Sequence, residues 1–252
     1  MPTDADGVRF LGIEFTGSSY EQVARELVEL AGRDCFSYVV TPNVDHVLLL
    51  NPRQRNATTG RLEEAYDNAA MRLCDSRILQ LLARFRGIRL DVVTGSDLTA
   101  YLFRNRWFAG RKIALVGGDE AMMAELGERF ADLEIVQHLP PMGVLRNERA
   151  IDAIVDFVAR ECADFTLFAI GAPQSEIVAA KCKADRRCRG VGLCIGASIE
   201  FLVDRKRRAP IWMQRLHLEW AFRLLSEPRR LWRRYLVTGP RIFALAWRER
   251  RH

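Results

Sequence analysis

Four short polar or glycine-containing segments of this chain each follow an apolar run that is typical of a β-strand. Gly117 and Gly118 would let the backbone approach a phosphate closely at a helix N-terminus, and Asp75 offers a carboxylate. Because ligands of open α/β sheets bind beyond the carboxyl ends of the strands, we expect the four segments to converge on one cleft. They are Thr41-Pro42-Asn43, Asp75, Gly117-Gly118-Asp119 and Gly171-Ala172-Pro173-Gln174-Ser175-Glu176.

Each segment also has a purely structural interpretation. Asn43 could cap a helix, and Asp75 could do the same. The pair Gly117-Gly118 lacks the full GxGxxG pattern of a dinucleotide site, and residues 171–176 could form only a turn between a strand and a helix. It is the occurrence of all four at predicted strand ends that favours a binding cleft.

The elements that position these segments are apolar runs alternating with amphipathic ones. Residues 95–105 predict a helix with Ser96 as its N-cap, and residues 148–163 predict another helix. Buried strands that alternate with helices are typical of a mainly parallel sheet covered on both faces. The predicted strands are residues 35–40, 71–74, 112–118, 134–139, 164–171 and 190–196.

We therefore predict an α/β fold with a Rossmann-like, mainly parallel sheet. It is expected in two α/β halves, the first in residues 1–108 and the second in residues 109–203. A helical, basic appendage rich in tryptophan and arginine follows in residues 204–252.

The composition bounds the class of protein. Of 252 residues, 49% are hydrophobic and 28% are charged, which is ordinary for a soluble chain with a substantial core. No run approaches the roughly 18 uncharged apolar residues of a membrane span, and the first ten residues lack an apolar signal segment. We therefore expect a cytoplasmic protein.

The sequence does not predict a metal site. Six cysteines show neither a CxxC pair nor a zinc-like spacing with the four histidines, so buried thiols are expected. The one D-x-D motif, Asp4-Ala5-Asp6, precedes the first predicted strand and is badly placed for a metal–diphosphate. The chain also lacks a GxxxxGK(S/T) phosphate loop and a GxSxG elbow. A bound diphosphate would then depend on arginines and helix N-termini.

The appendage carries most of the positive charge. Residues 204–252 hold 14 Lys and Arg against 4 Asp and Glu, a net charge of +10, whereas the rest of the chain is at −4. Such a segment could contact nucleic acid, a membrane or a phosphorylated substrate. An apolar residue recurs at every fourth position, which predicts a helical stripe. The residues of this stripe are Trp212, Leu216, Trp220 and Leu224.

Taken together, the motifs resemble the WecG/TagA/CpsF family, also called glycosyltransferase family 26. The resemblance runs from about Gly12 to Tyr235, with TPNVDHV, CDS, TGSDL and the GAP–SE turn in the family's order. The carboxyl side is the most specific part. It reads GVG (190–192), RAP (208–210), LEW (218–220), RLLSEPRR (223–230) and RRY (233–235).

The resemblance implies a glycosyltransferase without a cofactor or metal. Such enzymes move a hexose or N-acetylhexosamine from a UDP-sugar to a sugar on a polyprenyl-diphosphate lipid, inverting the anomeric centre. Their products are bacterial exopolysaccharides, capsules or cell-wall polymers. The resemblance also implies peripheral binding to the inner face of the cytoplasmic membrane, through the appendage.

The resemblance also assigns roles to residues. Thr41 and Asn43 would line the sugar site, and Asp75 would be the base. An inverting transfer is a single displacement, so a carboxylate must take the acceptor hydroxyl's proton. Guanidinium groups would stabilise the departing UDP, and the candidates are Arg208, Arg223, Arg230 and Arg233. The other candidate substrate-binding residues are Gly117, Gly118, Gly171, Pro173, Gln174 and Glu176.

Three positions depart from the family's pattern. Cys74-Asp75-Ser76 replaces ADG, and Val92-Val93 stands where an arginine commonly precedes TG-DL. In Gln174-Ser175-Glu176, a serine precedes the glutamate. We expect these positions to face the sugars, and they favour a donor or acceptor other than the N-acetylmannosaminyl case, such as a neutral hexose.

Other classes of protein remain as alternatives. A helical apolar stripe suits docking on protein or lipid better than stacking under bases, so no nucleic-acid partner is expected. A non-catalytic membrane adaptor could use the same appendage as an interfacial anchor. The missing GxGxxG pattern disfavours a nicotinamide enzyme. The apolar tail could also serve self-association, which would make a homo-oligomer.

Overall fold

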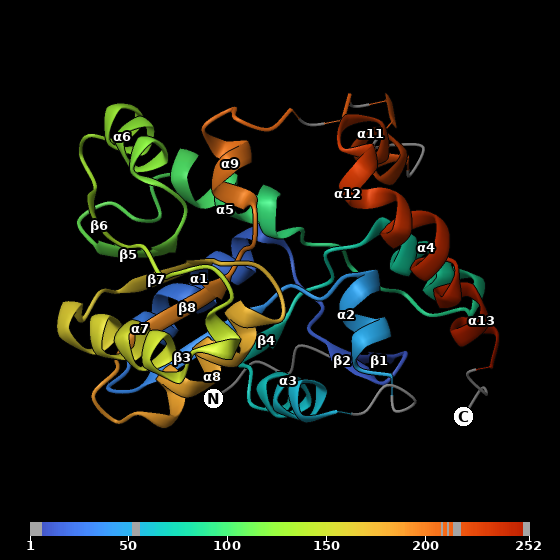
Figure 1. Ribbon diagram of the computed structural model, residues 1–252, viewed down its shortest axis with the longest axis horizontal. Coiled ribbons are helices and arrows are strands. Elements are labelled where there is room, and N and C mark those ends of the chain that lie inside the picture. The colour runs from blue at the N-terminus through green and yellow to red at the C-terminus, as the bar shows by residue number, and fades with distance from the viewer. Residues whose placement is uncertain (1–6, 52–55, 208, 211, 214–217, 249–252) are drawn as a thin grey trace.

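The computed structural model describes residues 7–51, 56–207, 209–210, 212–213 and 218–248. Its central sheet has six parallel strands in the order β4-β3-β8-β7-β5-β6. Helices cover both faces of this sheet (Figure 1), which confirms the predicted Rossmann-like α/β class. The strands are β3 (Phe36–Val40), β4 (Met71–Arg72), β5 (Lys112–Gly117), β6 (Glu134–His138), β7 (Phe165–Ala169) and β8 (Gly190–Cys194).

All six predicted strands are present, although β4 is shorter than expected. It ends at Arg72, and Cys74 forms only an isolated parallel bridge with Val92. A short antiparallel hairpin of β1 (Val8–Phe10) and β2 (Ile13–Phe15) precedes the sheet. The chain then runs past the β4 edge, where the Thr16 N–H donates to the Arg72 carbonyl over 2.9 Å.

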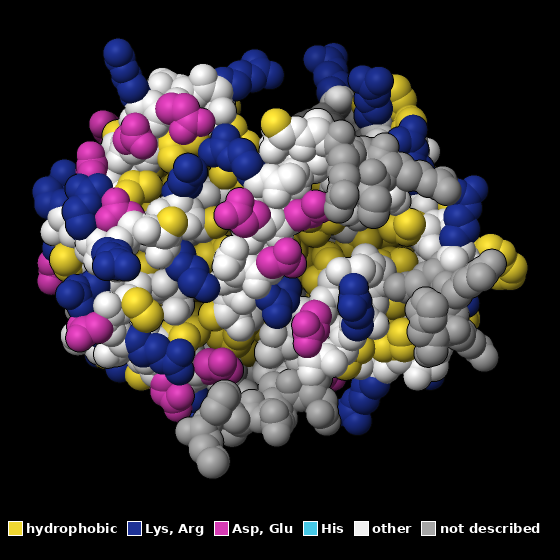
Figure 2. Space-filling model, turned by 90° about the horizontal axis from the view of Figure 1, so that it is seen from below, with side chains coloured by type: hydrophobic (Ala, Val, Ile, Leu, Met, Phe, Trp, Pro, Cys, Tyr) yellow, Lys and Arg dark blue, Asp and Glu magenta, His cyan; other side chains and the backbone are white. Residues whose placement is uncertain are grey.

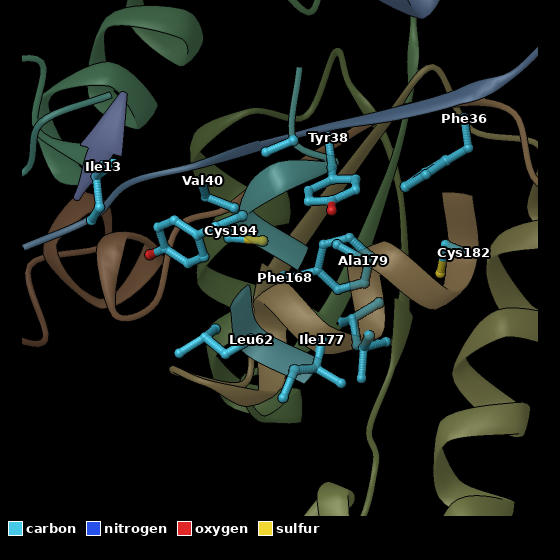
Figure 3. Packing of buried hydrophobic residues seen from close by; sticks show 14 of the residues in the cluster. Ile13, Phe36, Tyr38, Val40, Leu62, Phe168, Ile177, Ala179, Cys182 and Cys194 are labelled. Atoms are coloured by element: carbon cyan, nitrogen blue, oxygen red, sulfur yellow. The ribbon is translucent and has the colours of Figure 1, made fainter. Parts of the chain in front are cut away.

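Alternate residues of each strand pack into two cores, one on each face of the sheet. Tyr38 and Val40 face one core, while Val39 between them faces the other. Figure 3 shows side chains of β3, β7 and α8 gathered in the first of these cores, where the Phe36 and Phe168 rings meet edge to face. This period of two is what a buried strand requires.

Eight helices supply the outer layers within the described part of the chain. The first core is covered by α2 (Val44–Leu49), α3 (Ala57–Asp67), α7 (Glu148–Glu161) and α8 (Gln174–Ala184). The second is covered by α1 (Tyr20–Ala31), α5 (Gly95–Arg104), α6 (Glu120–Arg129) and α9 (Ser198–Leu202).

One predicted helix start was wrong by two residues. Thr94, and not Ser96, is the N-cap of α5, because its Oγ1 accepts from the Asp97 N–H over 3.1 Å. Helix α4 (Arg77–Phe85) precedes it and buries Leu79 and Ala83 in the first core.

The C-terminal segment is helical, as predicted. It contains α11 (Glu219–Ser226), α12 (Pro228–Trp232), the π-helical turn η3 (Arg233–Thr238) and α13 (Arg241–Arg248). Buried Ile242 attaches α13 to the first core, close to α2. Trp220 contacts Tyr235 with 6.3 Å between ring centroids. Leu216 of the predicted stripe lies outside the described residues.

Strands from the two predicted halves lie in the same sheet. Strand β3 of the first range and β8 of the second are neighbours, with Tyr38 opposite Gly192. The boundary near residue 108 stays a prediction. No helix in the described part of the chain has the length and apolar character that crossing a membrane requires.

Charged side chains are interspersed with apolar ones on the surface. Figure 2 shows Lys, Arg, Asp and Glu mixed over the face seen from below. Apolar side chains gather in the right half of that face, where Figure 1 places α2, α13 and the β1–β2 hairpin.

Candidate active site

A cleft of about 670 Å³ opens beside the carboxyl ends of β3 and β4. Helix α2 after β3 and helix α9 after the neighbouring β8 pack on opposite faces of the sheet. Ligands of open α/β sheets bind at such switch points. Residues of α11, η3 and α13 close the other side of the cleft. Its polar lining includes Asn43, Asp75, Arg77, Thr94, Arg207, Glu219 and Arg223.

Asp75 lies half-buried in this cleft and is held by its backbone and its side chain. Its N–H donates to the Pro42 carbonyl over 2.9 Å, and its Oδ1 accepts from the Gly95 N–H over 3.3 Å. Ser76, whose Oγ accepts from the Leu79 N–H over 3.2 Å, is the N-cap of α4. The carboxylate of Asp75 is therefore not consumed in capping that helix.

The surroundings of Asp75 change its acidity. Burial against protein atoms raises the pKa of the Asp75 carboxyl from 3.8 to about 6, although the positive charge of Arg223 and the Gly95 N–H act to lower it. The negative charge of Glu219 raises this pKa further. A carboxyl with a pKa just below neutrality is mostly ionised at pH 7 and still basic enough to accept a proton.

Asn43 both lines the cleft and caps α2. Its Oδ1 accepts from the Asp45 N–H over 3.0 Å, so the capping interpretation is confirmed, and the Asn43 N–H donates to Nδ1 of His46 over 3.2 Å. This hydrogen bond assigns the ring proton of His46 to Nε2. That nitrogen lies 3.2 Å from Oε1 of Glu176.

The pair His46–Glu176 is buried between α2 and α8. Only 6% of His46 and 3% of Glu176 is exposed, and Glu176 does not line the cleft among the described residues. Its Oε2 has no hydrogen-bond partner among them either. The structure therefore connects the turns after β3 and β7 through a buried histidine–carboxylate contact.

Thr41 lies beneath the cleft at the end of β3. It is 9% exposed, and its Oγ1 donates to the Cys194 carbonyl of β8 over 3.0 Å. A Cβ on Gly95 would lie 3.3 Å from Oγ1 of Thr41. Thr41 thus joins β3 to β8 and supports the backbone that binds Asp75.

The turns after β5 and β7 lie farther along the same sheet edge. Four strand spacings separate β5 from β4, which corresponds to about 19 Å. Gly117 has a φ of +102°, and a Cβ there would lie 2.9 Å from Cγ2 of Ile170. Close contact with β7 therefore requires this glycine. None of the five candidates in these turns lines the cleft within the described part: Gly117, Gly118, Gly171, Pro173 and Gln174.

The candidate arginines are distributed unequally. Arg223 lines the cleft, and its Cζ lies 5.4 Å from the centroid of the Phe201 ring. Arg233 is exposed and does not line it. Arg208 lies outside the described residues, and so does the side chain of Arg230.

Sequence reasoning missed four charged residues of the lining. Asp45 follows Val44 at the start of α2, Arg77 is the first residue of α4, Arg207 adjoins the predicted Arg208, and Glu219 is the centre of the LEW motif. Their positions next to motif residues were the available signal. Their direction toward the cleft depends on how α4 and α11 pack.

No group of three or more His, Cys, Asp or Glu side chains suited to a metal ion occurs within the described residues. All six cysteines are free. Cys74, Cys182, Cys188 and Cys194 are buried as expected, whereas Cys35 and Cys162 are exposed. Burial raises the pKa of the Cys74 thiol to about 12, so this neighbour of Asp75 is protonated at pH 7.

Two comparisons with known proteins show what this chain is similar to. Residues 8–252 match the model of the family described as "Glycosyl transferase WecG/TagA/CpsF family". A protein of Bacillus spizizenii, N-acetylglucosaminyldiphosphoundecaprenol N-acetyl-beta-D-mannosaminyltransferase, is 25% identical over 223 residues. The match covers 86% of this chain and 81% of the relative.

Proposed function

Because the chain belongs to the WecG/TagA/CpsF family of glycosyl transferases, we propose which sugar transfer it catalyses. The donor is a UDP-sugar, and the acceptor is a sugar on a polyprenyl diphosphate. A hexose or N-acetylhexosamine is transferred with inversion and without a metal or cofactor. The observation that carries the proposal is the cleft in which the Asp75 carboxyl, with a pKa of about 6, lies near the charge of Arg223.

Asp75 acts as the general base. The acceptor hydroxyl oxygen attacks the anomeric carbon of the donor while the bond from that carbon to the diphosphate oxygen breaks. The hydroxyl proton passes to the Asp75 carboxylate, and the electron pair of the broken bond leaves with UDP. A single displacement of this kind inverts the anomeric centre.

Cationic groups balance the charge of the two diphosphates. Arg223 faces the cleft together with Arg77 and Arg207, and guanidinium groups bind phosphate oxygens bidentately. Arg208, Arg230 and Arg233 are proposed to join them when substrate binds. Positive charge at the breaking bond stabilises UDP as it leaves.

Neutral groups position the sugars. Asn43 contacts the acceptor or donor sugar from the rim of the cleft, and Thr41 supports it from below. The two turns farther along the edge, with Gly117, Gly118, Gly171, Pro173 and Gln174, are proposed to bind the rest of the donor. Glu176 acts on this site through His46.

The cellular setting follows from the acceptor. The relative's name specifies an undecaprenyl diphosphate-linked N-acetylglucosamine, and a comparable lipid would place this enzyme at the inner face of the cytoplasmic membrane. The product would enter an exopolysaccharide, capsule or cell-wall polymer. The basic appendage is proposed to contact the membrane surface.

The direct test is to identify the product. The protein is incubated with a panel of UDP-sugars and polyprenyl-diphosphate glycolipids, with and without a chelator. We expect one donor–acceptor pair to give a new disaccharide lipid of inverted configuration, at equal rates in both conditions. Retention of configuration, or loss of activity with the chelator, would contradict this mechanism.

A further inference from the structure

One face of helix α4 leads away from the catalytic carboxyl. The helix begins next to Asp75, and four of its apolar residues line the cleft at positions i, i+3, i+4 and i+7. At a rise of 1.5 Å per residue, the stripe runs for about 12 Å along the helix. Its residues are Ile78, Leu81, Leu82 and Phe85.

The C-terminal helices supply the opposite apolar wall. Leu236 of η3 and Phe243 of α13 line the same cleft. Ile242, only 1% exposed, holds this wall against the first core beside α2. Figure 1 shows α13 running close to α4 and α2. We call the six residues Ile78, Leu81, Leu82, Phe85, Leu236 and Phe243 the apolar limb of the cleft.

The apolar limb opens to solvent at its outer end. The exposed fractions are 74% for Phe85, 57% for Leu236 and 56% for Phe243. Large apolar side chains gathered at the rim of a cleft mark a binding surface more often than a solvated one. Arg84 and Arg89 line a second hollow on the outer side of α4, so cationic side chains lie near this opening.

Charge and apolar character are therefore divided along one cleft. Asp75, Arg77 and Arg223 lie at the start of α4, and the apolar limb continues from there. A ligand that matches both parts has an anionic head and a hydrocarbon chain. A free nucleotide sugar matches the charged part alone.

Resting on the proposed function, we infer that the apolar limb binds the first isoprene units of the acceptor's polyprenyl chain. The diphosphate then lies near Arg223 and the chain leaves the protein between Phe85 and Phe243. In this arrangement the protein, and not only the membrane, binds the lipid next to its head group.

The test uses an acceptor with three isoprene units, which dissolves without a membrane, and a matched acceptor with a short alkyl chain. Leu81→Gln and Phe243→Ser make the limb polar. Trp247→Ser is the control, because Trp247 is 88% exposed on the same helix as Phe243 and does not line the cleft.

We expect the wild type to show a KM for the isoprenoid acceptor about tenfold lower than for the alkyl one. Each limb variant should raise the isoprenoid KM about tenfold, with kcat and the donor KM unchanged. The control should match the wild type. Equal KM values for both acceptors, or unaltered KM in both limb variants, would overturn the inference.

A binding measurement keeps this test separate from the proposed function. Affinity for a fluorescent farnesyl diphosphate analogue should fall about tenfold in the limb variants and remain unchanged in Trp247→Ser. If the limb variants lose affinity for the analogue but no acceptor is glycosylated, the inferred isoprenoid site is supported and the proposed function is contradicted. If limb variants instead turn a dimer into a monomer with unchanged analogue binding, a second copy of the chain occupies the limb.

Discussion

Asp75 combines partial burial, a hydrogen bond to the Gly95 N–H and a guanidinium nearby. These influences oppose one another, and burial prevails, so the carboxyl is a stronger base than a solvated aspartate. The same feature makes this residue a cost to folding at neutral pH, since the charged form is poorly solvated.

Asp75→Asn separates catalysis from folding. Asparagine keeps an oxygen that can accept from Gly95, but it cannot take a proton, so kcat should fall by about 10²–10⁴. Because the folded-state pKa of about 6 lies above 3.8, the stability that this carboxyl contributes is present at low pH and is lost as pH rises through 6.

The variant should therefore melt at a higher temperature than the wild type at pH 7, and this difference should shrink near pH ~4. Calorimetry at the two pH values and a rate assay check both effects. Wild-type turnover in the folded variant would exclude Asp75 as the base.

Two charges near Asp75 should move the pH profile in opposite directions. The wild-type rate should fall below about pH 6, where Asp75 becomes protonated. Arg223→Gln removes a charge that lowers this pKa, so the fall in rate at acid pH should occur at higher pH. Glu219→Gln removes a charge that raises this pKa, so the fall in rate should occur at lower pH.

Normalised rate profiles measure these shifts, because Arg223→Gln should also lower turnover about a hundredfold. Arg229→Gln is the control, since Arg229 is exposed on α12 and does not line the cleft. Shifts of both cleft variants in the same direction would show that the titrating group is not Asp75.

At the scale of elements, α2 and α8 are connected through one buried contact. His46 accepts from the backbone of Asn43 and faces Glu176, which is 130 residues away in the sequence. The start of α2, and with it the rim of the cleft, is thereby tied to the turn after β7. We therefore predict that Glu176 stabilises the site, although it does not line the cleft in the described part of the chain.

Glu176→Ala should destabilise the protein by about 1–3 kcal/mol, because the buried Nε2–H of His46 loses its acceptor. Glu176→Gln keeps an acceptor oxygen and should lose less. Urea denaturation measures both. If Glu176→Ala instead left stability unchanged and raised a substrate KM, Glu176 would bind substrate directly.

Packing of α4 and α11 also determines what the cleft contains. Both helices were short amphipathic or basic runs in the sequence, and each places charged and apolar residues toward the same space. The expectation that the positions departing from the family's pattern face the sugars was wrong for two of them, because Val93, where the family commonly carries an arginine, is 2% exposed in the second core and Ser175 is 1% exposed. The positive charge near Asp75 therefore comes from other cleft residues, Arg223 of α11 and Arg77 of α4.

At the scale of the whole molecule, the basic appendage is tied to the body at its start. Both Oδ atoms of Asp119 accept from Arg205 over 2.8 Å, and Arg205 also reaches Glu125. Arg129 pairs with Asp204 over 2.8 Å. Large apolar side chains of the appendage remain exposed, among them Trp212 and Trp232.

This surface predicts salt-sensitive membrane binding. The protein should sediment with vesicles in which about one third of the lipids are anionic when the salt concentration is low. Most of it should be released at about 1 M salt, where the Debye length is about 3 Å. Neutral vesicles are the control and should bind much less. Equal binding to both vesicles at every salt concentration would contradict an electrostatic contact.

Much of the fold could be predicted from the sequence. Apolar runs of four to eight residues indicate strands and the amphipathic segments between them indicate helices, since periodicities of 2 and 3.6 reflect local burial. The net charge of +10 in residues 204–252 can likewise be counted from the sequence alone. Asp75, Asn43 and Arg223, which line one cleft, were all candidates on motif grounds.

Only the tertiary structure decided which of these segments meet. Strands that are consecutive in the sequence are not neighbours throughout the sheet, so the Gly117 turn lies four strand spacings from β4 while Arg223 lies in the cleft. The contact of His46 with Glu176 and the apolar limb between α4 and α13 also join distant parts of the chain. Local patterns specify which face of an element is buried, whereas the partner of that face depends on how all the elements pack together.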